Sequence, residues 1–174
     1  MKVFFDTEFT GLHKNTSLIS LGLVDEDGRS FYAEFNDYDK SQVNDWIKQN
    51  VISHLKYKDA DKEPASAGWI KLDNCMTVFG DKEFVKNNLK VWLSKYEKVQ
   101  LVSDVCHYDM VLFIDIFGTA FDLPSNVSPC CHDINQDIAD YMDISQKEAF
   151  DVSREQFLGC YLSELKGNKH NALL

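Results

Sequence analysis

The sequence predicts an α/β domain whose mixed sheet has three antiparallel strands followed by parallel strands and is flanked by helices. Before residue 36, three short apolar or alternating segments are separated by turn signals, as in consecutive strands. After residue 80, apolar positions recur at helical spacing on both sides of one short apolar segment. Strands first, then alternating helices and strands, are typical of a mixed sheet covered by helices.

The first three strands are expected within residues 2–12, 17–24 and 31–35. The second and third are joined across Asp27 and Gly28, a pair that favours hairpin turns. The third alternates apolar and polar side chains, as a half-buried strand does.

Helices and strands alternate in the rest of the chain. Helical spacing first relates four apolar residues, Val43, Trp46, Ile47 and Val51. Residues 57–68, which include Pro64, are interpreted as a surface loop. An amphipathic helix is expected over 81–96, then a strand over 99–103 and a helix that ends at Gly118.

The last third is expected to hold a short strand over 127–132, a helix capped by Asp133 that extends through Tyr141, and a helix over 153–165. The sequence shows no internal repeat, low-complexity tract or linker, so residues 1–174 are expected to form a single domain.

Composition narrows the class of protein. With 174 residues, 44% of them hydrophobic, the chain can bury a sizeable core. No apolar run reaches the ~20 residues of a membrane span, and the N-terminus lacks the pattern of a signal peptide. We therefore expect a cytoplasmic protein without a membrane partner. The five cysteines lack C-x-x-C spacing and are expected to be reduced and mostly buried.

The net charge of −10 argues against a protein that coats long nucleic acids, because such binding depends on Lys and Arg. A net charge of −10 is compatible with an enzyme that holds only a few terminal nucleotides, since bound divalent cations reverse the sign of the local charge. Weak, salt-sensitive binding to ends is the expectation.

Two carboxylates, Asp6 and Glu8, stand on the otherwise apolar first strand. Residues two apart share a face of a strand, with Cα atoms roughly 6.5–7 Å apart. Desolvating both charges is costly unless a cation compensates, and no Lys or Arg occurs between Val3 and His13. The pair predicts a divalent-metal site, although taken alone it also fits a frayed strand end in water.

Residues 5–12, with the sequence FDTEFTGL, resemble the first motif of the DEDD exonuclease superfamily. The resemblance implies a ribonuclease H-like fold and gives Asp6 and Glu8 as metal ligands. It also implies a group of substrate-binding residues: Thr7, Phe9, Thr10, Gly11, Leu12 and Tyr108.

The second acidic motif of this superfamily resembles Tyr108-Asp109 at the start of a helix, without the usual His-Asn pair. The resemblance implies that Asp109 holds the second metal, directly or through water. Alone, Asp109 would be interpreted as a carboxylate favoured at a helix N-terminus. Asp104 is the rival candidate and is better interpreted as a helix cap.

The third motif, in the histidine (DEDDh) branch, resembles His170-Asn171-Ala172-Leu173 and implies that His170 is the general base. The family's final Asp would follow Leu174, where the sequence stops. Three alternatives remain: a shortened sequence, a substitute acid, or a chain no longer competent as an enzyme.

Together the resemblances imply a 3′-to-5′ exonuclease that uses two divalent cations, Mg²⁺ or Mn²⁺. The catalytic residues would be Asp6, Glu8, Asp109 and His170. Residues 4–9, 18–22 and 44–52 are similar to small stand-alone bacterial and phage exoribonucleases, which implies single-stranded RNA 3′ ends as substrate and a homodimer. DNA ends and overhangs on duplexes stay open.

Two other functions remain in view. A catalytically impaired module that binds nucleic-acid ends would keep metal binding without hydrolysis. A ribonuclease H-like nuclease that cuts internally would give a mixture of product lengths at once, whereas trimming from an end gives a ladder.

Overall fold

The computed structural model describes residues 1–57, 68–72 and 74–154. The strands are β1 (Lys2–Phe9), β2 (Leu18–Asp25), β3 (Ser30–Phe35), β4 (Gly68–Leu72), β5 (Cys75–Gly80), β6 (Gln100–Ser103) and β7 (His132–Asp133). The helices are α1 (Asp45–Asn50), α2 (Lys82–Leu93), α3 (His107–Phe117), α4 (Ile134–Met142) and α5 (Gln146–Asp151), with 3-10 turns η1 (Lys40–Gln42), η2 (Ile52–His54) and η4 (Ala120–Asp122).

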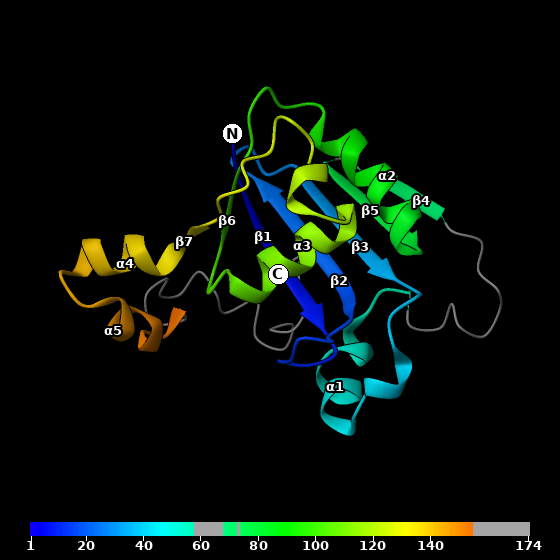
Figure 1. Cartoon of the computed structure of the whole chain (residues 1–174), viewed down its shortest axis with the longest axis horizontal. Coiled ribbons are helices and arrows are strands. Elements are labelled where there is room, and N and C mark those ends of the chain that lie inside the picture. Colours follow the sequence, from blue (N-terminus) through cyan, green and yellow to red (C-terminus); the bar gives the residue numbers. More distant parts are fainter. Residues whose placement is uncertain (58–67, 73, 155–174) are drawn as a thin grey trace.

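The described strands form one seven-stranded mixed sheet in the order β4-β5-β3-β2-β1-β6-β7. Strands β1, β2 and β3 are antiparallel neighbours, whereas β6 pairs parallel with β1 and β5 pairs parallel with β3. Helices α2 and α3 lie on one face of this sheet (Figure 1). The predicted fold class is confirmed, and the arrangement is consistent with a ribonuclease H-like fold.

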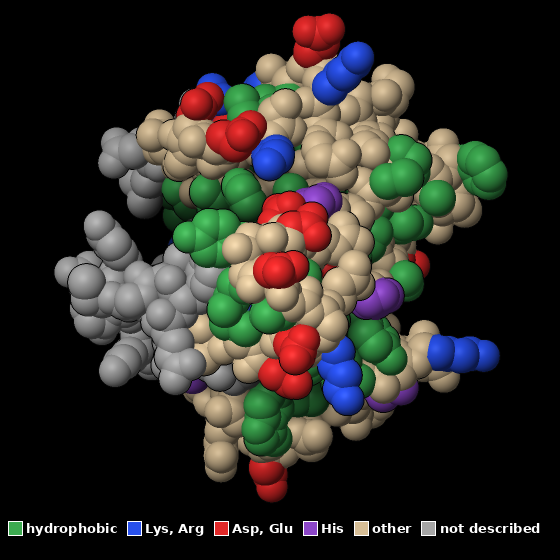
Figure 2. Space-filling model, turned by 90° about the vertical axis from the view of Figure 1, so that its left-hand side faces the viewer, with side chains coloured by type: hydrophobic (Ala, Val, Ile, Leu, Met, Phe, Trp, Pro, Cys, Tyr) green, Lys and Arg blue, Asp and Glu red, His purple; other side chains and the backbone are tan. Residues whose placement is uncertain are grey.

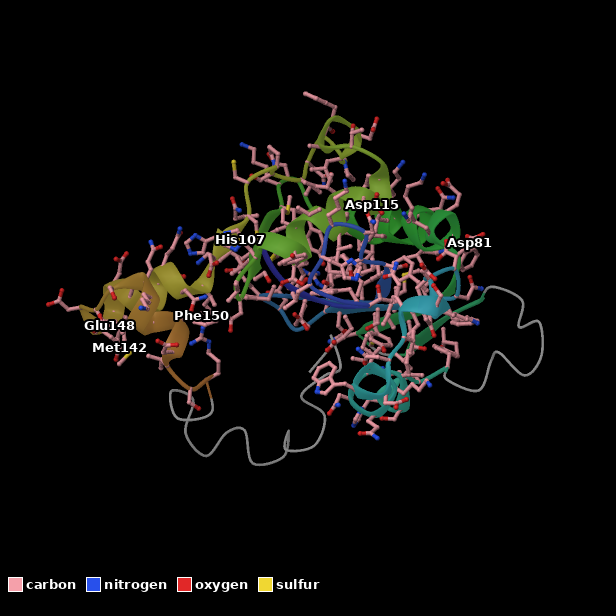
Figure 3. All side chains as sticks on the ribbon, turned by 60° about the horizontal axis from the view of Figure 1, so that its bottom comes forward. Asp81, His107, Asp115, Met142, Glu148 and Phe150 are labelled. Carbon is pink, nitrogen blue, oxygen red and sulfur yellow. The ribbon has the colours of Figure 1, made fainter. Side chains whose placement is uncertain are left out.

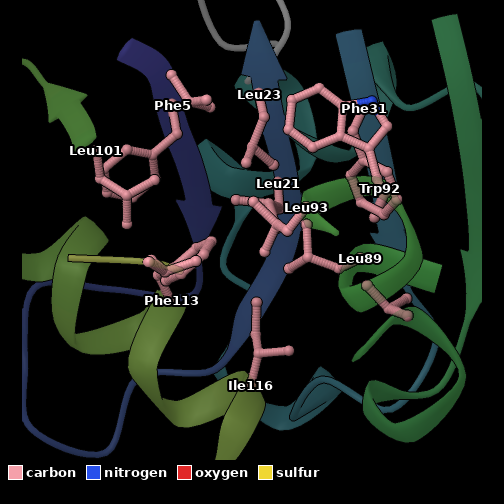
Figure 4. Close-up of a cluster of buried hydrophobic side chains, with 14 of the residues drawn as sticks. Phe5, Leu21, Leu23, Phe31, Leu89, Trp92, Leu93, Leu101, Phe113 and Ile116 are labelled. Atoms are coloured by element: carbon pink, nitrogen blue, oxygen red, sulfur yellow. The ribbon is translucent and has the colours of Figure 1, made fainter. Parts of the chain in front are cut away.

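The core lies between the sheet and helices α2 and α3 (Figure 4). The Phe5 ring of β1 meets Phe113 of α3 edge to face, with centroids 5.5 Å apart. The ring centroids of Phe31 on β3 and Trp92 on α2 are 6.1 Å apart. Aromatic pairs of this kind stabilise the fold beyond the contribution of the apolar area that they bury. Strand β1, which carries Asp6, is therefore held against α3.

The β2–β3 turn has the predicted conformation, since Gly28 has a φ of +77°, which glycine adopts without strain. The buried Asp25 carboxylate accepts hydrogen bonds from Nε of Arg29 at 2.6 Å and from the Tyr96 hydroxyl at 2.7 Å. Burial alone would raise the pKa of Asp25, but the hydrogen bonds from Tyr96 and Arg29 outweigh it and lower the pKa below its usual value.

Strands β4 and β5 were not anticipated from the sequence. The predicted loop over 57–68 ends where β4 begins, and residues 58–67 lie outside the described part of the chain. Strand β5 exists because it pairs with β3, in a register that places Ser30 opposite Cys75. Local periodicity carries no information about a partner that is so far away in the chain.

Several boundaries also differ from expectation. Helix α1 is short, and of its two apolar residues Ile47 is buried whereas Trp46 is 56% exposed. The last strand is β7 at 132–133 rather than 127–132, and α5 was not anticipated, whereas the predicted cap at Asp133 is confirmed. The helix expected over 153–165 falls almost wholly outside the described residues.

The four cysteines in the described ranges are free, as expected, but the expectation of burial is wrong. Cys130 is exposed and the other three, Cys75, Cys106 and Cys131, are partly exposed. Among the described helices, none is long and apolar enough to cross a membrane.

Candidate active site

Strand β1 separates its side chains onto two faces. Val3, Phe5 and Thr7 are buried, whereas the alternate residues Asp6 and Glu8 are exposed or partly exposed. This alternation is the normal consequence of the pleat. The two carboxylates therefore share one face of β1, and that strand is held between β2 and β6 in the middle of the sheet.

The regular ladder of β1 ends directly after the second carboxylate. Glu8 pairs with Ser20, but Phe9 pairs with Leu18, so a bulge interrupts the β1–β2 register there. The loop that follows is fixed by Thr10, whose hydroxyl donates to Oε1 of Gln42 at 2.5 Å and accepts from the backbone N–H of Ser17 at 2.9 Å. The bulge and these hydrogen bonds form a rigid rim beside the carboxylates.

A pocket of about 520 Å³ opens at this rim. Nine of its lining residues are candidates from the sequence: Asp6, Thr7, Glu8, Phe9, Thr10, Gly11, Leu12, Tyr108 and Asp109. The structure thus brings together every described residue that was predicted to be catalytic or substrate-binding; the rival acid Asp104 is not among them. His170, the remaining candidate, lies outside the described residues.

Four further lining residues were not candidates: Asn44, Trp46, Ile47 and Val105. Asn44 caps α1 by accepting a hydrogen bond from the backbone N–H of Ile47 at 2.9 Å. That cap fixes the start of α1, so that Trp46 lies at the pocket. From the sequence, Trp46 was only one of four apolar residues at helical spacing, and its 56% exposure at the pocket is known only from the structure.

Asp109 approaches the strand from α3 and is buried beneath it. Its Oδ1 accepts hydrogen bonds from the Thr7 hydroxyl at 2.5 Å and the Thr7 backbone N–H at 3.2 Å, while Oδ2 accepts from the Ser103 hydroxyl at 3.0 Å. Desolvation raises the pKa of Asp109, although these hydrogen bonds oppose the shift. The carboxylate is fixed to the back of the strand that carries Asp6 and Glu8.

The three acids repel one another. Although the Asp6 side chain is open to the pocket, desolvation by the surrounding protein and the charge of Asp109 raise its pKa to about 7. Desolvation, followed by the charges of Asp6 and Asp109, raises the pKa of Glu8 to about 8. Like charges in a partly desolvated cleft are typical of functional sites.

The oxygen donors of Asp6 and Glu8 fit a hard divalent cation such as Mg²⁺, which also keeps several of its waters. A bound cation would offset the repulsion that raises their pKa values. Within the described ranges, no three His, Cys, Asp or Glu side chains are grouped to hold a metal ion. The fit therefore rests on the two carboxylates of β1, with Asp109 held one layer behind them.

The rim of the pocket is aromatic and apolar. Phe9 and Tyr108 stack with ring centroids 5.6 Å apart and planes 20° from parallel. Leu12 is 74% exposed, although it lines the pocket. Exposed flat side chains beside acidic groups can hold the bases of a single-stranded nucleic acid.

Asp104, the rival acidic candidate, does not cap α3, so its interpretation as a cap was wrong. Helix α3 begins after Cys106 without a side-chain cap. The Asp104 carboxylate instead pairs with Arg154 at 2.8 Å and accepts from Asn135. Asp104 is absent from the pocket lining that contains Asp109.

The fold and pocket define an α/β protein of ribonuclease H-like architecture with an acidic cleft. Two proteins of Mycobacterium tuberculosis, from strains CDC 1551 and H37Rv, are similar in sequence, and both are named 3′-5′ exoribonuclease. Each is 28% identical over 141 residues, which cover 78% of this chain and 73% of the relative. A scan against models of protein families finds no match.

Proposed function

We propose that this chain is a metal-dependent 3′-to-5′ exoribonuclease that removes nucleotides from the 3′ ends of single-stranded RNA. The observation that carries the proposal is the pocket in which Asp6, Glu8 and Asp109 meet beside exposed aromatic side chains. The names of the two M. tuberculosis relatives support the direction of cleavage and RNA as the substrate.

The proposed roles follow from the position of each group. Asp6 and Glu8 would hold two divalent cations, Mg²⁺ or Mn²⁺, with Asp109 contributing from behind the strand. When bound, such cations activate the attacking water and stabilise the leaving 3′ oxygen. The hydrogen bonds of Thr7 and Ser103 orient Asp109 and keep its carboxylate from rotating.

His170 is proposed as the general base that takes the proton of the attacking water. The ordinary pKa of histidine, about 6.5, suits this role near neutral pH. The terminal nucleotides would lie along the pocket rim, with bases against Phe9, Tyr108 and Trp46 and the backbone along the loop at Thr10 and Gly11. A homodimer and a cytoplasmic location stay predictions.

The proposal is tested with 5′-labelled single-stranded RNA and DNA oligonucleotides in Mg²⁺, Mn²⁺ or EDTA. We expect a ladder of products shortened from the 3′ end that needs the metal and is lost in Asp6→Asn. Asp115→Asn is the matched control, because this exposed acid pairs with Lys82 outside the pocket. A form with Asp added after Leu174 measures the contribution of that acid.

Other outcomes would select another function. Products of mixed internal lengths at the first time point would indicate an endonuclease. Metal-dependent retention of the oligonucleotide, without cleavage in any form, would favour the binding module. Activity that is unchanged in Asp6→Asn would contradict the proposed site.

A further inference from the structure

The turn between β6 and α3 contains a strained residue. Val105 has a φ of +56°, in the left-handed region that β-branched residues rarely adopt. Its side chain lines the acidic pocket, and the helix that begins two residues later carries Tyr108 and Asp109 in its first turn. Strain of this kind persists only where the surroundings hold the backbone in place.

Arg154 holds Asp104, the residue before Val105 in this turn. Its Nε donates to Oδ2 of Asp104 at 2.8 Å and its Nη2 donates to Oδ1 of the same carboxylate at 2.8 Å. This two-point contact matches the guanidinium fork and fixes both groups in orientation. Nη1 donates to the carbonyl oxygens of Ala149 and Val152, so the same side chain ties α5 to Asp104.

Asp133 holds Cys106, the residue after Val105, and Asn135 in turn contacts Asp133. Oδ2 of Asp133 accepts from the backbone N–H of Cys106 at 3.3 Å, and Oδ1 accepts from the Asn135 amide at 2.8 Å. Asn135 also donates to Asp104 and accepts from Arg154, which closes the network. Helices α4 and α5 thus lie beside the start of α3, where His107 is labelled in Figure 3.

We infer that Asp104, Asp133, Asn135 and Arg154 form a clamp that keeps Val105 left-handed and thereby positions Tyr108 and Asp109 at the pocket. Helix α3 needs such a device because no side chain caps its N-terminus. These are positioning residues for the cleavage step, and in that respect the inference rests on the proposed function.

The first test replaces Arg154 by Lys, which keeps the charge and loses the fork. We expect kcat for RNA cleavage to fall about tenfold because Asp109 is misaligned. KM should rise by less than about threefold, because Tyr108 shifts with Asp109 while Phe9 on β1 and Trp46 on α1 stay in place. Arg29→Lys is the matched control, since Arg29 is the only other arginine in the sequence and pairs with Asp25 at the β2–β3 turn. Equal kcat in both variants would overturn the clamp.

The second test asks whether the clamp acts through the strained turn. Glycine adopts a positive φ freely, so Val105→Gly should need the clamp less, and Arg154→Lys should lower kcat by less than about threefold in that background. If Arg154 serves only to attach α5, the loss will be the same with Val or Gly at position 105, and the inference fails.

A third readout does not need activity. Hydrogen exchange at the backbone amides of 106–109, and of Thr7, which donates to Asp109, should be faster in Arg154→Lys and unchanged in Arg29→Lys. An unsubstituted chain that does not cleave RNA would refute the proposed function while the exchange still tests the clamp. Unchanged exchange at these amides would overturn the clamp whatever the activity.

Discussion

At the scale of single residues, the pocket concentrates negative charge where the fold alone would not require it. Asp6 and Glu8 share a face of β1, and Asp109 lies behind the same strand. Their raised pKa values mean that the ionised forms are disfavoured in the folded protein without metal. Residues that cost stability and meet in one pocket are typical of functional sites.

The repulsion between these carboxylates should lower the stability of the folded protein when no metal is bound. In EDTA at pH 8, Asp6→Asn should raise the melting temperature, because it removes one of the mutually repelling carboxylates. A gain of 1 kcal/mol corresponds to about 2–4 °C for a chain of this size. Calorimetry measures the shift, and Asp140→Asn, an exposed acid on α4, serves as the control. A lower melting temperature in Asp6→Asn than in the control would contradict the repulsion.

The Asp25 carboxylate, unlike those of Asp6 and Glu8, stabilises the fold in its ionised form. Its folded pKa lies below the unfolded value, so its stabilisation is present above about pH 4 and is lost as the pH falls through the folded pKa. Asp25→Asn should reduce the free energy of unfolding at pH 7 by about 2–3 kcal/mol, because the donors of Arg29 and Tyr96 lose a charged partner.

Urea unfolding between pH 7 and pH 2 measures both effects. In the unsubstituted chain, part of the free energy of unfolding is lost at low pH because Asp25 becomes protonated. Asp25→Asn should not show this part of the loss. Asp27→Asn is the control, since its side chain is 63% exposed and also pairs with Arg29. An equal fall in the free energy of unfolding in Asp25→Asn and Asp27→Asn would show that burial of the Asp25–Arg29 pair is unimportant.

At the scale of elements, α1 presents a large aromatic side chain without burying it. Ile47 is buried in a small cluster with Ile19, Val51 and Leu55, whereas Trp46 from the same helix is 56% exposed at the pocket. The helix is therefore held in place through Ile47, while the neighbouring Trp46 is exposed at the pocket. Two functions are divided between adjacent positions.

Trp46→Ala should raise KM for RNA about tenfold or more, because stacking on an aromatic residue contributes about 1–3 kcal/mol per base. The free energy of unfolding should fall by about 1–2 kcal/mol, because the covered half of the Trp46 side chain is lost as well. Steady-state kinetics and urea unfolding check the two values. Phe121→Ala, a 99% exposed aromatic on η4 outside the pocket lining, should change neither.

At the scale of the whole molecule, the net charge of −10 opposes binding of long polyanions. Figure 2 shows one face on which acidic and positive side chains are interspersed among hydrophobic ones, without a continuous positive patch. In the proposed exoribonuclease, recognition of RNA therefore depends on a short stretch at the pocket, with contacts to the terminal nucleotides and their bases.

This picture predicts that kcat/KM becomes independent of oligonucleotide length beyond a few nucleotides. It also predicts that log KM rises with log salt with a slope below about 2, since each neutralised phosphate of a single strand contributes about 0.7. Kinetics on oligonucleotides of increasing length, at several NaCl concentrations and constant Mg²⁺, give both quantities. A steep slope with affinity growing along the strand would indicate an extended binding path instead.

Strands β1 to β3, helix α2, strand β6 and helix α3 were predictable because their apolar periodicity is local and their turns carry glycine signals. Eight consecutive residues of β1 and its loop also indicated the acidic site. Other features depend on partners distant in the chain. Strand β5 pairs with β3, Trp46 lies at the pocket through the cap of α1, and Asp104 meets Arg154 fifty residues later.

The sequence by itself therefore determined the class of fold and the residues of β1 that face the pocket, because backbone pleat and side-chain period are properties of a short segment. Only the tertiary structure decided the edge of the sheet, the place of Trp46 at the pocket and the strained turn at Val105. Each of these depends on long-range pairing, whose energy is realised only when distant segments meet.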